Sequence, residues 1–188
     1  MSGTIVSPHL RGLTGADRDR IEAITRSVGR FREDEIPVAL EVFDEAVRGD
    51  STNTYSVLGA ELEGCLVGWI CWGPTPCTLA TYDLYWMAVD PELQGTGIGT
   101  ALLTEMERRL EGTARLIVIE TAGRPDYADT RAFYQARGYR PAATIADFYG
   151  PGDDQMILVK YLSGDWPASH SERSEESARL PMDIGART

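Results

Sequence analysis

Histidine is scarce in this sequence, and its scarcity limits the chemistry to be expected. Only two histidines occur, His9 and His170, and both lie near the ends of the 188-residue chain. Ser-His-Asp triads, Cys-His pairs and histidine-rich metal sites are therefore not expected. We expect any general base to be a carboxylate or a bound water molecule, and no metal to take part.

Positive charge and long apolar runs are also missing. The 18 lysines and arginines against 29 acidic residues give a formal net charge of -11. Nucleic acids and anionic membranes bind basic surfaces, so neither partner is expected, and a cationic substrate is favoured. No apolar run of about 18 residues or more occurs, and residues 1–10 lack the pattern of a signal peptide. The sequence therefore favours a cytoplasmic protein.

The length and composition favour one domain. Three cysteines at a spacing of six residues, Cys65, Cys71 and Cys77, match neither a disulfide framework nor a zinc finger, so reduced thiols are expected. A hydrophobic content of 43% is enough for one core. We expect the domain to span residues 1–162 and the Ser-, Glu- and Arg-rich stretch 163–188 to be a disordered tail.

What the sequence does contain is a glycine-rich turn between a strand and a helix. Residues 81–89 are rich in β-formers, Pro91 ends that strand, and Gly95, Gly97 and Gly99 precede apolar residues at helical spacing. Glycines let the backbone approach a ligand closely, and a helix N-terminus adds unpaired amides and the positive end of the helix dipole. The turn predicts a site for a phosphate or pyrophosphate.

Two nucleotide-binding motifs fit this turn poorly. A dinucleotide-binding fingerprint would place a glycine where this chain has Thr100, and a Walker loop would need a lysine, which the turn lacks. A dinucleotide-dependent oxidoreductase is therefore the weaker alternative.

The flanking residues predict a mixed order of helices and strands. We expect a short strand near residues 8–11, two helices ending at Gly29 and Gly49, and a hairpin of 55–62 with 65–72. The strand 81–89 should alternate, with Tyr82, Leu84, Trp86 and Ala88 on one side. After the glycine turn and its helix we expect a strand at 116–121 parallel to 81–89, a helix at 126–138, and strands at 139–145 and 155–161 joined by a polar loop.

Two motifs resemble one family. The pattern Gln94-x-x-Gly97-x-Gly99 after a strand is similar to motif A of the GCN5-related N-acetyltransferase (GNAT) superfamily, which binds acyl-CoA. Residues 131–139, in which Phe133-Tyr134 is followed by Gly138-Tyr139, are similar to its motif B. The resemblance implies an α+β fold: a mostly antiparallel twisted sheet of about six to seven strands, helices on both faces, and a parallel strand pair that splays at the acyl-CoA site.

The resemblance also implies the ligand and its contacts. Acetyl-CoA would be the cosubstrate, and its acetyl group would pass directly to a primary amine in a ternary complex. The implied cofactor-binding residues follow the chain: Met87, Ala88 and Val89 through their backbone, then Gln94, Gly95, Thr96, Gly97, Ile98, Gly99 and Thr100 at the pyrophosphate, and Asp129 and Tyr134. The family often has an asparagine seven residues before the tyrosine, where this chain has Tyr127.

Two residues are the catalytic candidates. Tyr134 matches the family tyrosine near the thioester sulfur, and because the pKa of tyrosine (~10) exceeds that of a thiol (~8.5), it is a workable acid for the leaving thiolate. The alternative is that Tyr134 only packs beside Phe133. Glu120 lies where ribosomal-protein N-terminal acetyltransferases carry a glutamate that acts as the base through water, with Asp83 and Tyr85 as candidates to hold that water. The alternative is a solvated carboxylate paired with an arginine.

The acceptor is less well defined by the sequence. In the family it lies between two loops, here residues 31–35 and 147–150 with Asp153 and Asp154, and Phe31, Phe148, Tyr149 or Trp72 are candidates for cation–π contact with an ammonium group. A small amine, such as an amino sugar or polyamine, fits the acidic charge. A protein N-terminus or lysine (the ribosomal-protein type) and a non-catalytic CoA-binding module remain alternatives. Homodimers are common in the family.

Overall fold

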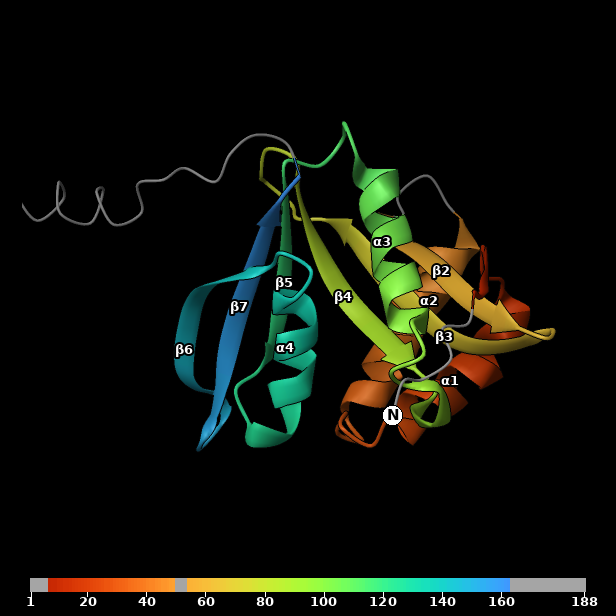
Figure 1. The fold of residues 1–188 in the computed structure, drawn as a ribbon, viewed down its shortest axis with the longest axis horizontal. Helices are drawn as coiled ribbons and strands as arrows, with labels where there is room; N and C mark the ends of the chain where they lie inside the picture. The colour runs from red at the N-terminus through yellow and green to blue at the C-terminus, as the bar shows by residue number, and fades with distance from the viewer. Residues whose placement is uncertain (1–6, 50–53, 163–188) are drawn as a thin grey trace, which may run out of the picture.

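The computed structural model describes residues 7–49 and 54–162, so the expected tail at 163–188 lies outside the described residues. The described chain forms one seven-stranded sheet in the order β1-β2-β3-β4-β5-β7-β6, with helices on both faces (Figure 1). The elements in chain order are β1 (His9–Arg11), η1 (Gly15–Asp17), α1 (Arg18–Ser27), α2 (Glu35–Arg48), β2 (Ser56–Leu62), β3 (Cys65–Pro74), β4 (Thr81–Val89), η2 (Pro91–Leu93), α3 (Ile98–Leu110), β5 (Leu116–Ala122), η3 (Pro125–Tyr127), α4 (Ala128–Gln135), β6 (Arg140–Gly150) and β7 (Asp153–Tyr161). Every strand pair is antiparallel except β4 with β5, which confirms the mixed fold and the parallel pair expected from the sequence.

The sheet is covered by two apolar layers. On one face α1 and α2 bury Ile21, Ile24 and Phe43 against Trp69 of β3. On the other face, which is toward the viewer in Figure 1, α3 packs on the sheet and α4 lies beside it. Each fully buried side chain of this size stabilises the fold by about 1.5–3 kcal/mol, so both layers hold the central strands β3 and β4 firmly in place.

Local signals in the sequence set the ends of several elements. Asp17 accepts a hydrogen bond from the Thr14 amide (2.9 Å) in the capping box that starts the first helical segment. Gly49, at a φ of +66°, ends α2 in the left-handed region. None of the helices within residues 7–49 and 54–162 is long and apolar enough to cross a membrane.

A bulge in β4 changes which side chains face the two layers. Cys71 of β3 lies opposite Trp86, but Trp72 lies opposite Leu84, so Tyr85 is an extra residue in β4. As a result Tyr82 and Leu84 contact the α3 layer whereas Trp86 and Ala88 contact the α1–α2 layer. The uninterrupted alternation expected from the sequence is therefore wrong, because one inserted residue reverses the side-chain direction for the rest of the strand.

From the bulge at Tyr85 onward, β4 separates from β5. Their parallel pairing runs from Thr81 opposite Leu116 to Leu84 opposite Ile119 and does not continue. The edge of β4 from Tyr85 to Val89 therefore has β3 on one side and no strand on the other. In Figure 1 the two strands diverge from the middle of the sheet downward.

The end of the chain differs from the sequence expectation in one further way. The expected polar loop between the last two strands is short, because β6 continues to Gly150 and β7 begins at Asp153. The pairing is irregular between Ile145 and Gly150, where Asp147 takes a φ of +54°. The Asp147 carboxylate accepts a hydrogen bond from the Gly152 amide (2.6 Å), which closes this hairpin.

Candidate functional site

The glycine turn forms one end of the site. Gly95 and Gly97 have φ angles of +79° and +103°, which strongly favour glycine, and Gly97 caps the N-terminus of α3. The first amides of α3 have no partner within the helix. The structure therefore presents the backbone donors and the helix dipole that an anionic group requires.

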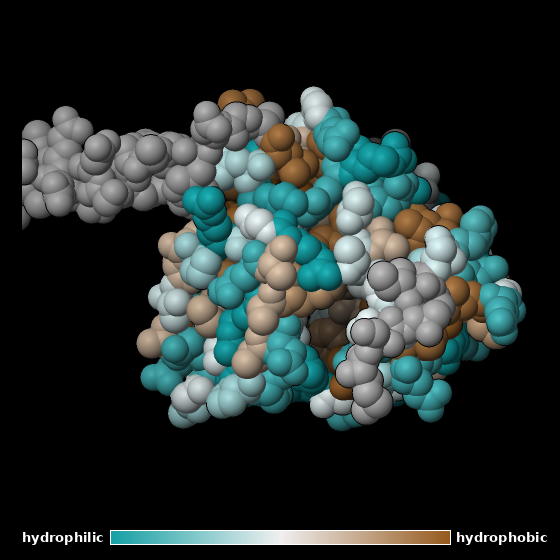
Figure 2. Space-filling model, viewed as in Figure 1, coloured by the Kyte–Doolittle hydropathy of each residue, from teal (hydrophilic) through white to brown (hydrophobic). Residues whose placement is uncertain are grey.

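A single cavity of about 1300 Å³ extends from this turn between the diverging strands β4 and β5. Figure 2 shows it as a hollow with an apolar floor, between α4 and the lower end of β4. The candidate residues that line it are Met87, Ala88, Val89, Gln94, Gly95, Gly97, Gly99, Thr100, Glu120, Asp129 and Tyr134. Two candidates do not line it: Ile98 is buried in the core, and the Thr96 hydroxyl donates to the Leu93 carbonyl (2.6 Å).

Tyr134 lies on α4 at the wall of this cavity. Its side chain is 5% exposed, and its ring packs edge-on against Phe133 and Tyr139, with centroid distances of 5.2 and 5.8 Å. Burial raises the pKa of Tyr134, so the phenol is protonated at neutral pH. Tyr134 therefore packs beside Phe133 and also lines the cavity.

Glu120 lies on β5 one residue past the point where the two strands separate. Its carboxylate accepts a hydrogen bond from the buried Gln155 amide group (2.7 Å). Desolvation in the cavity, reinforced by the negative charge of Asp83, raises the pKa of Glu120, and the hydrogen bond from Gln155 opposes this rise. Glu120 has no ion pair with another described residue, and the same holds for Asp83, which accepts a hydrogen bond from the Thr75 hydroxyl (2.7 Å).

The residues expected at the acceptor divide into two groups. Phe31, Tyr149 and Asp153 line the cavity. Phe148 is 54% exposed and does not line it, and Trp72 is buried in the α3 layer. Trp86 lines the cavity instead of Trp72 and stacks at a tilt on Phe31, with ring centroids 5.3 Å apart, because the bulge at Tyr85 directs it to this face.

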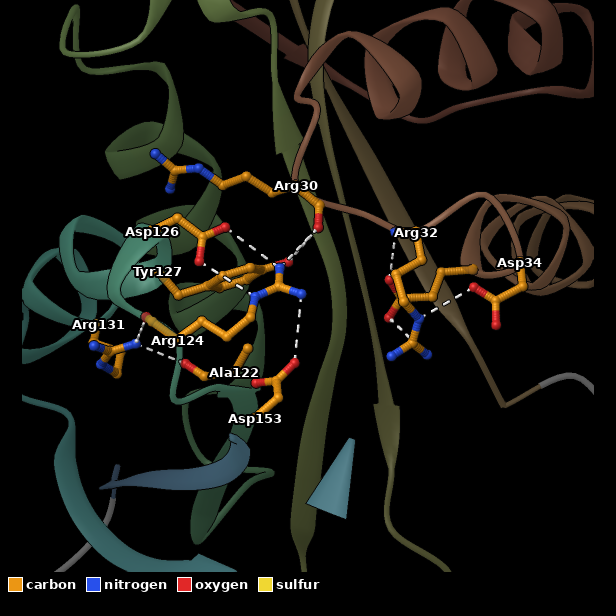
Figure 3. Close-up of polar contacts among 10 residues, drawn as sticks. Arg30, Arg32, Asp34, Ala122, Arg124, Asp126, Tyr127, Arg131 and Asp153 are labelled. Atoms are coloured by element: carbon orange, nitrogen blue, oxygen red, sulfur yellow. Dashed lines mark hydrogen bonds and ion pairs between the residues drawn. The ribbon is translucent and has the colours of Figure 1, made fainter. Parts of the chain in front are cut away.

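Several arginines at the site were not identified from the sequence. Arg124 contacts three segments: Asp126 (3.3 Å), Asp153 of β7 (3.4 Å) and the carbonyl of Arg30 in the α1–α2 loop (3.4 Å), as Figure 3 shows. Arg137 lines the cavity beside the glycine turn, where it bonds the Thr100 hydroxyl and lies over the Phe133 ring. Arg137 lies within residues 131–139, the stretch similar to motif B, so the sequence did contain a motif from which it could have been identified.

Comparisons with known proteins agree with this geometry. The sequence model of the acetyltransferase (GNAT) family matches residues 21–139. The chain is 31% identical over 105 residues to an uncharacterised N-acetyltransferase of Methanocaldococcus jannaschii, a match that covers 54% of this chain and 63% of that relative's length. It is 36% identical over 104 residues to the blasticidin-S acetyltransferase of Streptomyces morookaense, covering 54% and 68% of the two chains.

Solved structures share the fold. A protein from Desulfovibrio desulfuricans described as a GNAT-family acetyltransferase superposes with a TM-score of 0.78 at 36% identity, over 84% of this chain and all of that one. An aminoglycoside 6'-N-acetyltransferase solved with coenzyme A has a TM-score of 0.66 at 14% identity over 84% and 99% of the chains, a likeness of fold alone. With the family match extending over more than half of its residues, this chain belongs to the acetyltransferase (GNAT) family.

Proposed function

We propose that this protein is an acetyl-CoA-dependent N-acetyltransferase that transfers an acetyl group directly to the primary amine of a small molecule. The observation that carries the proposal is that one cavity joins the anion-binding turn, a protonated tyrosine and two carboxylates, Glu120 and Asp83, which form no ion pair with any residue in the described ranges 7–49 and 54–162. Acyl transfer from a thioester to an amine needs a base for the amine and an acid for the leaving thiolate, and the turn would hold the coenzyme that carries the thioester.

The residues present fit coenzyme A. The turn from Gln94 to Thr100 would hold the pyrophosphate through backbone amides. Arg137 adds a positive charge beside the turn, and its buried Nε atom has no partner among the described residues. The open edge of β4 from Met87 to Val89 would pair with the amides of the pantetheine arm, and Asp129 lines the same passage. Bound in this way, acetyl-CoA supplies the thioester.

Two proton transfers would be carried out by protein groups. Tyr134 would donate its phenolic proton to the sulfur as the carbon–sulfur bond breaks, and it would regain a proton from the second N–H that the nitrogen loses as the amide forms. The backbone amide of Val89 would polarise the thioester carbonyl. Glu120 would accept a proton from the incoming ammonium group through a water molecule held by Asp83 and Tyr85. The raised pKa of Glu120 makes it a stronger base for an amine whose own pKa is about 10.

The charges at the far end of the cavity favour a cationic acceptor. Tyr85 lies beside Asp83 and Tyr149 lies close enough to Glu120 to feel its charge. Trp86 lines the same cavity, and an ammonium group is stabilised both by carboxylates and by aromatic faces. The 36% identity to the blasticidin-S acetyltransferase supports a small molecule as the acceptor. A protein N-terminus or lysine is the alternative acceptor.

The test is the release of free CoA thiol from acetyl-CoA with a panel of polyamines, amino sugars, amino acids and free N-terminal peptides. We expect acceptor-dependent release with at least one small amine and little release without an acceptor. Tight binding of CoA with no release on any member of the panel would contradict the proposal and favour a non-catalytic CoA-binding module. Tight binding of NADH would favour the oxidoreductase alternative.

A further inference from the structure

We propose that Gln155 of β7 is a positioning residue for Glu120: its side-chain amide holds the Glu120 carboxylate in one orientation. This inference rests on the proposed function, in which Glu120 is the base, and it adds the residue that fixes this base. Gln155 does not line the cavity, so it would influence the reaction through Glu120 and not by touching a substrate.

The two side chains meet because of the register of their strands. β5 and β7 are antiparallel neighbours (Figure 1), and Glu120 lies opposite Ile157, two residues beyond Gln155. Glu120 and Gln155 are therefore diagonal neighbours on one face of the sheet, where long side chains can reach each other. The backbone of β7 is held at this point, because the Gly123 amide donates to the Asp154 carbonyl (2.7 Å). The amide of Gln155 thus projects from a fixed position.

The contact between them joins a buried group to a group in the cavity. The Gln155 Nε2 donates to Oε2 of Glu120 at 2.7 Å. Gln155 is 3% exposed, whereas Glu120 lines the cavity. A buried amide without a hydrogen bond destabilises a folded protein, and a carboxylate is a strong acceptor, so the contact is favoured while Glu120 is ionised. Within residues 7–49 and 54–162 the other oxygen of Glu120, Oε1, accepts no hydrogen bond, which leaves it available to a water molecule.

A held carboxylate is a better base than a free one. A glutamate side chain in open space samples several rotamers, whereas proton transfer needs one orientation within hydrogen-bond reach. An amide can fix that orientation without adding charge. An arginine in its place would lower the pKa of Glu120 strongly and weaken it as a base. Gln155 therefore has the chemistry that a positioning residue for this carboxylate requires.

The titratable groups around Glu120 determine how its pKa should respond. Burial and the charge of Asp83 on β4 raise the pKa of Glu120, and the hydrogen bond from β7 opposes them. Tyr149 of β6 also lies close to Glu120, and Glu35 of α2 and Asp153 of β7 act on Tyr149. Burial raises the pKa of Tyr149, so its phenol is neutral at neutral pH. Loss of the hydrogen bond should therefore raise the pKa of Glu120 further.

The test removes the donor and keeps the size of the side chain. Gln155→Met retains an unbranched chain of similar length that cannot donate a hydrogen bond. For the wild type and the variant we would measure kcat with the best amine of the panel, the pH–rate profile and the Kd for CoA. Gln135→Met is the matched control, because it makes the same replacement at an exposed position at the end of α4 that does not line the cavity.

We expect Gln155→Met to lower kcat at neutral pH about 10- to 100-fold, because the base is no longer held in place. The acidic limb should move to higher pH, since activity requires the carboxylate and its pKa has risen. The Kd for CoA should stay unchanged, which is a readout independent of activity. In a Glu120→Gln background the same replacement should lower kcat little further, because Gln155 acts through Glu120. Gln135→Met should change none of these quantities.

Gln155→Glu keeps the inference testable if the methionine variant does not fold. It preserves the size of the side chain and places a second carboxyl group beside Glu120, so the two would share a proton and the limb should again move to higher pH. An unmoved limb, or an equal loss of kcat in the Glu120→Gln background, would overturn the inference while leaving acetyl transfer in place. No transfer to any amine by the wild type would overturn the proposed function and the inference with it.

Discussion

Tyr134→Phe is expected to lower kcat by about 10²- to 10⁴-fold, the usual contribution of a general acid, and to leave the KM for acetyl-CoA nearly unchanged. The replacement keeps the ring that packs between Phe133 and Tyr139 and removes only the hydroxyl. Without that proton donor the thiolate would leave unprotonated, so the loss should fall on the chemical step. Steady-state kinetics with the best amine of the panel measure both constants.

Tyr139→Phe is the matched control for this prediction. Tyr139 is the neighbouring ring on the same side of the sheet, is 1% exposed, and does not line the cavity. Its buried hydroxyl lies beside Glu107 of α3, which does not line the cavity, so its removal should change kcat little. Equal losses in the two variants would show that packing, and not proton donation, explains the effect at Tyr134.

Glu120→Gln is expected to lower kcat by about 10²- to 10⁴-fold at neutral pH and to remove the acidic limb that Glu120 contributes to the pH–rate profile. The base form of Glu120 is the carboxylate, so activity should fall as the pH drops through its pKa. Because desolvation and Asp83 raise that pKa, the limb should lie above the pH at which an ordinary glutamate titrates. The acceptor amine titrates equally in both proteins, so the difference between their profiles isolates Glu120.

Asp83→Asn tests whether the negative charge of Asp83 raises the pKa of Glu120. Removing the negative charge of Asp83 takes away one cause of the raised pKa of Glu120. The acidic limb should therefore move to lower pH in this variant, whereas loss of a water-holding residue alone would lower the rate without moving the limb. If the Glu120→Gln variant keeps the acidic limb of the pH–rate profile, Glu120 is not the base.

The glycine turn could be predicted from the sequence because its information is local. Gly95, Gly97 and Gly99 stand in one turn, and the φ angles of the first two explain why glycine is needed there. The parallel pairing of β4 with β5 also follows from a local fact, the helix between them. Motif B gave Tyr134 in the same way, from residues that are neighbours in the chain.

The aromatic wall of the cavity could not be predicted because it depends on contacts between distant segments. Phe31 of the α1–α2 loop and Trp86 of β4 meet only in the fold. The bulge at Tyr85 has no sequence signal of its own, yet it turns Trp86 to the α1–α2 face of the sheet, where Trp86 contacts Phe31. One inserted residue in β4 thus decides the face of the sheet on which Trp86 lies.

Direct transfer of the acetyl group is the central claim, and a single-turnover experiment with acetyl-CoA labelled in its acetyl group tests it most directly. The protein, in excess over acetyl-CoA, would be mixed with the best amine and quenched, and protein and small molecules would be analysed by mass spectrometry. We predict that the label appears on the amine nitrogen and that the protein mass stays unchanged, with or without the amine. Label bound covalently to the protein, or label that stays on CoA while the coenzyme is tightly bound, would contradict the account.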